Sequence, residues 1–81
     1  MRVETLGNNQ VLVHNEDLVY FFSYDTEIAW KMFDSDRIHL SKYWDYSATT
    51  LKYLKKAFNI TDSKAQIIKN ERGLYIFEMT F

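Results

Sequence analysis

Apolar and polar side chains alternate along most of this sequence, which is the pattern of half-buried β-strands. The alternation predicts strands over residues 2–6, 10–14, 18–23, 26–33, 37–41 and 74–81. Residues 18–23 are apolar on both faces, as in a central strand. Turn-forming residues separate the strands, for example at residues 7–9, 15–17 and 34–36.

One helix is predicted over residues 47–58. Ser47 has the side chain of a good N-cap, since its hydroxyl can accept a hydrogen bond from the first turn. The apolar residues that follow at helical spacing form one stripe: Leu51, Leu54, Ala57 and Phe58. A helix of this kind packs its stripe on the sheet.

The segment over residues 62–70 fits either a short helix or a strand. Because residues 74–81 alternate, with Tyr75, Phe77, Met79 and Phe81 on one face, we predict that residues 65–70 form the hairpin partner of that last strand. The expected architecture is therefore α+β, with a small, mainly antiparallel sheet of about five to six strands and one helix packed on it, in a single domain over residues 1–81.

Aromatic residues are unusually frequent for so short a chain. The 81 residues include two Trp, six Tyr and six Phe, and no cysteine that could form a disulfide or ligate a metal. A domain of this size buries only about 60–65% of its unfolded surface, so its core is thin. We therefore expect some of the aromatic side chains at the surface, in a partner or dimer interface.

Charge and hydropathy argue against a membrane or a generic polyanion as partner. The formal net charge is −1, although acidic residues concentrate in residues 16–45 and basic residues in residues 46–81. No apolar run approaches the ~20 residues of a membrane span, and residues 1–10 lack the apolar region of a signal peptide. These features predict a cytoplasmic protein without membrane contact.

No catalytic or cofactor motif stands out, so we predict a non-enzymatic protein without a cofactor. His14 and His39 sit at alternating strand positions and are interpreted as half-exposed sheet residues. Asp34 and Asp36 offer two oxygen ligands, but the remainder of a calcium loop is missing and both are good turn formers. Phosphate-binding glycine motifs are absent.

Two groups of residues could bind a partner. Ser47, Thr49, Thr50 and Lys52 open the predicted helix, where backbone N–H groups favour an anion, unless Ser47 only caps the helix and the threonines pack or face water. Aromatic residues just before the helix could stack on bases or form a protein–protein hot spot, unless Trp44 and Tyr46 simply cover the sheet. The candidates for protein binding are Trp30, Tyr43, Trp44, Tyr46, Asp34 and Asp36, and those for nucleic-acid binding are Ser47, Thr49, Thr50, Lys52, Lys55 and Lys56.

Two sequence blocks carry a resemblance. They are Ser23-Tyr24-Asp25-Thr26-Glu27-Ile28-Ala29 and Trp44-Asp45-Tyr46-Ser47-Ala48-Thr49-Thr50-Leu51-Lys52-Tyr53-Leu54. Together they resemble small uncharacterised proteins of bacteriophages and mobile elements that have the pattern S-Y-x-T-x-I-A followed by Y-S-x-T-T-x-K-Y-L. The resemblance implies an accessory phage protein in the host cytoplasm and no particular activity. Small phage proteins of this kind often block a host protein, as anti-CRISPR proteins do.

Three functions follow as hypotheses. The first is a binding protein that inhibits a host protein or ribonucleoprotein complex, such as a defence or nucleic-acid-processing complex, by direct contact. The second is a small nucleic-acid-binding module that uses the lysines of the helix. The third is a structural homodimer that pairs through a sheet edge or an aromatic face.

Overall fold

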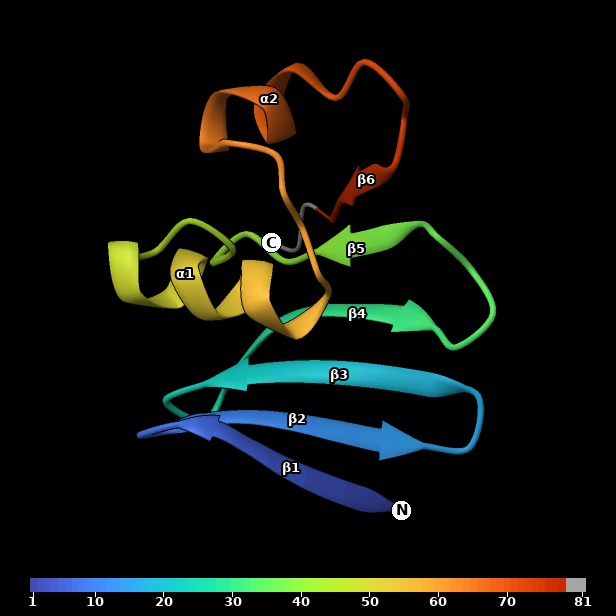
Figure 1. The fold of residues 1–81 in the computed structure, drawn as a ribbon, viewed down its shortest axis with the longest axis vertical. Helices are drawn as coiled ribbons and strands as arrows, with labels where there is room; N and C mark the ends of the chain where they lie inside the picture. Colours follow the sequence, from blue (N-terminus) through green and yellow to red (C-terminus); the bar gives the residue numbers. More distant parts are fainter. Residues whose placement is uncertain (79–81) are drawn as a thin grey trace.

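The fold is a six-stranded sheet with two short helices, and the computed structural model describes it for residues 1–78. The strands lie in sequence order across the sheet (Figure 1). Neighbouring strands from β1 to β5 are antiparallel, and β6 is parallel to β5. This confirms the predicted α+β class. The elements are β1 Arg2–Gly7, β2 Gln10–Asn15, β3 Leu18–Ser23, β4 Thr26–Met32, β5 Ile38–Leu40, α1 Ala48–Ala57, α2 Lys64–Lys69 and β6 Tyr75–Phe77.

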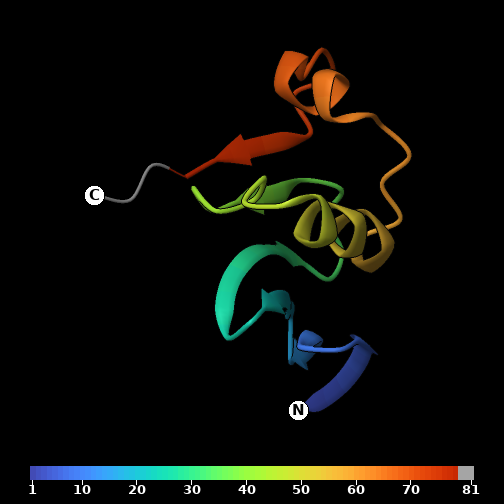
Figure 2. The same cartoon turned by 90° about the vertical axis from the view of Figure 1, so that its left-hand side faces the viewer.

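The helix α1 lies on one face of the sheet and provides the centre of the core (Figure 2). Leu54 of α1 is fully buried, together with Phe21 of β3 and Leu40 of β5. Burying one such side chain stabilises the fold by about 1.5–3 kcal/mol. Ser47 is the N-cap of α1, as predicted, and Phe58 is its C-cap. The apolar stripe of the helix therefore sets which face of the sheet becomes the interior.

The opposite face of the sheet, which we call the open face, carries partly exposed apolar side chains. Cross-strand pairing places them in two rows, because residues directly opposite one another share a face. No helix covers this face within residues 1–78 (Figure 2). The rows are Val3, Val13, Tyr20 and Trp30, and beside them Val11 and Phe22.

The prediction of a strand over residues 65–70 is wrong, because this segment forms the second helix, α2. Ser63 and Gln66 make a capping box: the Ser63 side chain accepts from the Gln66 N–H at 3.2 Å, and the Gln66 side chain accepts from the Ser63 N–H at 2.7 Å. Asn70 ends the helix in the left-handed conformation, with φ 51°. Ile67 is fully buried, so α2 adds to the core.

The last strand is consequently not part of a hairpin. β6 pairs in parallel with β5, from Ile38 opposite Tyr75 to Leu40 opposite Phe77. Asn70 holds it there, since its amide donates to the Tyr75 carbonyl at 2.8 Å and accepts from the Tyr75 N–H at 3.0 Å. The predicted continuation of this strand through Met79 and Phe81 lies outside the described residues.

Within residues 1–78 the helices are α1 and α2, and neither is long and apolar enough to cross a membrane.

Candidate functional site: a tyrosine-rimmed pocket

Two segments that are distant in the sequence meet at the N-terminal end of α1. They are the β3–β4 turn and the loop that leads into α1, and between them lies a pocket of about 640 Å³. This volume is in the range of about 300–1,000 Å³ that is typical of ligand sites. We call it the tyrosine pocket, and none of its lining side chains is charged. They are Ser23, Tyr24, Thr26, Ile28, Tyr43, Tyr46, Ser47, Thr49 and Thr50.

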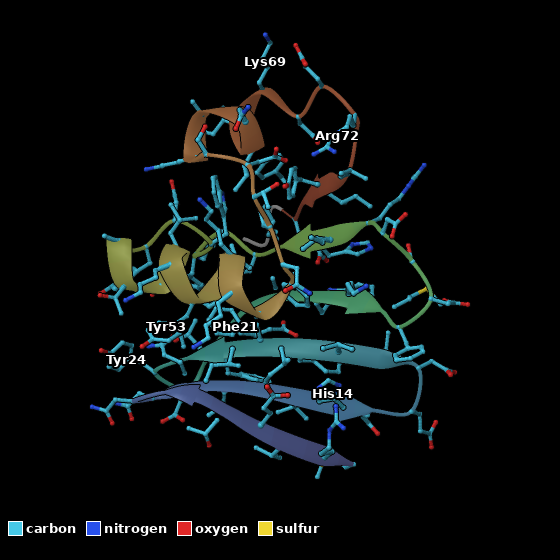
Figure 3. The ribbon with its side chains drawn as sticks, viewed as in Figure 1. His14, Phe21, Tyr24, Tyr53, Lys69 and Arg72 are labelled. Carbon is cyan, nitrogen blue, oxygen red and sulfur yellow. The ribbon has the colours of Figure 1, made fainter. Side chains whose placement is uncertain are left out.

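The β3–β4 turn holds Tyr24 at the rim of the pocket. Tyr24 and Asp25 have positive φ angles of 50° and 64°, so they form a two-residue turn with the backbone twist that hairpins favour. For a tyrosine this conformation costs about 1–2 kcal/mol, whereas an aspartate adopts it more readily. The Tyr24 N–H donates to the Asn9 carbonyl at 2.9 Å, which ties this turn to the β1–β2 turn. Tyr24 remains 58% exposed at the end of the molecule where α1 begins (Figure 3).

A chain of three hydroxyl groups joins the floor of the pocket to the helix. Ser47 Oγ accepts from the Thr50 N–H at 3.0 Å and donates to Thr50 Oγ1 at 3.1 Å. Thr50 Oγ1 lies 3.1 Å from Ser23 Oγ, and both of these side chains are buried. The hydrogen bonds fix the start of α1 to the end of β3. Ser47 and Thr50 therefore act in capping and packing, while Thr49 faces the pocket and is exposed.

The loop before α1 points its aromatic residues in opposite directions. Trp44 is buried, and its ring meets the ring of Phe77 edge-on at 5.7 Å between centroids. Tyr43 and Tyr46 on either side of it are 41% and 76% exposed. The Tyr46 N–H donates to the Tyr43 carbonyl at 3.0 Å, which closes the loop into a turn. Trp44 thus anchors the loop from the inside, and the two tyrosines rim the pocket.

The structure does not bring the other predicted protein-binding residues to this pocket. The prediction that Trp44 contacts a partner conflicts with its burial, because a side chain in the core has no free surface to offer. Trp30 lies on the open face, stacked on His39 with 3.9 Å between ring centroids. Asp34 and Asp36 are exposed between β4 and β5, at the far end of β4 from the pocket (Figure 1).

The residues predicted to bind nucleic acid also lie in separate places along α1. Lys52 and Lys56 hold their ammonium groups over the Tyr53 ring, at 5.6 and 5.8 Å from its centroid. With a rise of about 1.5 Å per residue, Lys55 and Lys56 lie about 12–14 Å along the helix from Ser47. The hydroxyl groups occupy the N-terminal end of α1 and the last two lysines occupy its C-terminal end. They do not form one site.

A second polar group lies next to the open face. The Trp30 indole N–H donates to Glu78 Oε1 at 2.8 Å, and His39 Nδ1 is 3.7 Å from the same oxygen. Burial, and secondly the negative charge of Glu78, raise the pKa of Glu27 above its ordinary value. Within residues 1–78 there is no group of three histidine or carboxylate side chains that could hold a metal ion.

The sequence-based site prediction missed Tyr24 and its neighbours Ser23, Thr26 and Ile28. A signal for them was nevertheless present, because all four belong to the first of the two sequence blocks described above. The second block contains the pocket residues Tyr46, Ser47, Thr49 and Thr50. The fold thus brings both blocks to one pocket.

Comparison with known proteins identifies a family. A model of the family described as "Family of unknown function (DUF8033)" matches residues 1–74, and the chain therefore belongs to this family. The matched region contains β1 to β5, both helices and every residue that lines the tyrosine pocket. No curated protein and no solved structure matches the chain.

Proposed function

For this member of a family without a known function, we propose a non-enzymatic role as a protein-binding module that contacts its partner through the tyrosine pocket. The observation that carries the proposal is the exposure of three tyrosines from two separate segments around one uncharged, hydroxyl-lined pocket. The partner would place an uncharged side chain in the pocket and lie on the tyrosines around it.

The chemistry of the rim favours a protein as partner. Tyrosine provides a large amphipathic contact area with only two side-chain torsions to immobilise, and it is enriched at interfaces and hot spots. Serine and threonine hydroxyls next to it adapt as donors or acceptors, as in antibody binding loops. Tyr24, Tyr43 and Tyr46 stand beside Thr26 and Thr49 in this arrangement.

The framework of the pocket is held by internal contacts. The Ser23–Thr50–Ser47 hydroxyl chain and the buried Trp44 hold the two segments that carry the tyrosines. A surface that is ordered before binding loses less conformational entropy when the partner arrives. Such an arrangement supports binding rather than chemistry, because the lining contains no charged acid or base and no cysteine.

The identity of the partner is proposed from the sequence resemblance alone. That resemblance favours a host protein or ribonucleoprotein complex, which the chain would inhibit in the host cytoplasm in the manner of anti-CRISPR proteins. The pocket supports the direct-contact part of this hypothesis, and the inhibition stays a prediction.

Nucleic acid is the second candidate, and one observation favours it. The Thr50 N–H is already bonded to Ser47 Oγ, but the N–H groups of Ala48 and Thr49 have no intrahelical acceptor and point toward the N-terminal end of α1, where a phosphate could bind. The absence of any cationic side chain from the lining weighs against it. Binding to single-stranded DNA or RNA that weakens steeply as salt rises would support this alternative.

Co-purification with matched variants tests the proposal. Tyr46→Ala and Tyr24→Ala remove side chains that are 76% and 58% exposed, and Phe33→Ala and Ile68→Ala remove apolar side chains elsewhere with 73% and 59% exposure. We expect a partner protein that co-purifies with the wild type and both controls, and about tenfold weaker capture by each tyrosine variant. Equal loss in the controls, or a wild type that captures nucleic acid without any protein, would contradict the proposal.

A further inference from the structure

The strand β1 forms a free edge of the sheet. Within residues 1–78 it pairs with β2 alone, and the residues from Arg2 to Thr5 are all exposed. An exposed edge strand of this length presents unpaired backbone groups to another strand. At the other edge, β6 has only three residues.

The alternating hydrogen-bond pattern of the sheet shows which backbone N–H and carbonyl groups of β1 point away from β2. In an antiparallel pair, residues alternate between those that exchange hydrogen bonds and those that do not. The Tyr24 N–H bonds to the Asn9 carbonyl, so odd-numbered residues of β2 direct their backbone groups to β3. The even-numbered residues of β2 therefore bond to β1, where they oppose Arg2 and Glu4. The N–H and carbonyl groups of Val3 and Thr5 consequently face away from the sheet.

The charges on β1 favour one register in which two copies can pair. Antiparallel pairing that places Val3 opposite Val3 of a second copy sets Arg2 opposite Glu4 on both sides of the two-fold axis. A shift that places Val3 opposite Thr5 sets Glu4 against Glu4, and like charges directly opposite one another are destabilising. We propose that the chain forms a homodimer through antiparallel β1 strands centred on Val3, with two Arg2–Glu4 pairs between the copies.

This pairing fits the surroundings of β1. Val3 lies on the open face and is 57% exposed, so the two copies bring their valines together and continue the apolar rows across the axis. Gly7, against which the Tyr53 ring of α1 packs, lies beyond the paired segment. The tyrosine pocket is lined by residues of β3, β4, the turn between them, the loop before α1 and the start of α1, so pairing through β1 uses none of its lining residues.

Charge reversal tests the proposed register. Sedimentation of the wild type should give twice the 9.8 kDa chain mass. Arg2→Glu or Glu4→Arg alone should weaken the dimer about tenfold or more, because each turns both attractive pairs into repulsive ones. The double variant with both changes should recover the dimer, and an equimolar mixture of the two single variants should form a heterodimer.

Val3→Pro provides an independent check, because it removes an outward N–H without removing a bond to β2. We expect a folded monomer by circular dichroism and sedimentation. A wild type that stays monomeric at millimolar concentration overturns the proposal, as does a dimer that tolerates Val3→Pro or Arg2→Glu unchanged. An edge that pairs only with a segment of another protein would appear as the first of these results.

Discussion

Replacing Thr50 with valine tests whether the hydroxyl chain holds the tyrosine pocket together. The change preserves shape and replaces the hydroxyl group, whose Oγ1 is 3.1 Å from both Ser23 Oγ and Ser47 Oγ, with a methyl group. Ser47 is partly exposed and can turn to water, but Ser23 is only 3% exposed and loses its side-chain partner. A buried hydroxyl left without a partner costs about 1–3 kcal/mol, and the added methyl group of valine offsets up to about 0.8 kcal/mol.

We therefore expect Thr50→Val to lower the free energy of unfolding by about 1–2 kcal/mol, which corresponds to a fall of roughly 4–16 °C in melting temperature for a domain of this size. Urea denaturation followed by circular dichroism measures the change. Ser23→Ala in the Thr50→Val background removes the stranded hydroxyl, so the double variant should be less destabilised than the sum of the two single variants by about 1 kcal/mol. A neutral Thr50→Val, or costs that simply add, would refute the reasoning.

Three further predictions concern packing and protonation. Gly7→Ala places a Cβ about 2.6 Å from the Tyr53 ring, so it should destabilise the fold by about 1–3 kcal/mol in denaturant titrations, and Tyr53→Leu in the same chain should restore most of the loss. Burial and the charge of Glu78 raise the pKa of Glu27, so the free energy of unfolding should fall as the pH rises through that pKa. Glu27→Gln should therefore raise the melting temperature at pH 7 and leave it unchanged at pH 3. An equal gain at both pH values would contradict the raised pKa of Glu27. Burial, with a hydrogen bond to a carboxylate, raises the pKa of Tyr75 to about 12, so stability should fall between pH 10 and 12 as the unfolded chain ionises first, and Tyr75→Phe should remove this fall.

The sheet was predictable from the sequence because each strand leaves a local signal. Alternation and turn residues located β1 to β5 to within a few residues, from Arg2–Gly7 to Ile38–Leu40. The Ser47 cap and the apolar stripe likewise located α1. These features depend on neighbouring residues alone, so no tertiary information was needed.

The C-terminal part was not predictable in the same way. The strand over residues 65–70 was predicted as the hairpin partner of the alternating residues 74–81, although Ser63 and Gln66 already had the spacing of a capping box. The parallel pairing of β6 depends on the side chain of Asn70, which bonds to the backbone of Tyr75. Parallel neighbours require a crossover connection, and local periodicity does not reveal where such a connection returns.

The candidate site was predictable in part. Tyr43, Tyr46 and Thr49 do line the pocket, because the start of a helix is recognisable in sequence and its N-terminal end is exposed. Trp44 could not be assigned to the core by periodicity, since it lies in a turn where side chains have no regular spacing. Tyr24 was missed because a positive φ angle at a tyrosine is rare and has no sequence signature.

Site-specific photocrosslinking in cells tests the central proposal most directly. A photoreactive phenylalanine analogue replaces Tyr46 at the pocket rim in one sample and Phe33, of similar exposure, in another. We predict one discrete crosslinked protein from position 46, lost when Tyr24→Ala is added, and none from position 33. The same crosslinks from both positions, or a crosslink at position 46 that is unchanged by Tyr24→Ala, would contradict the proposal that the tyrosine pocket binds a partner protein.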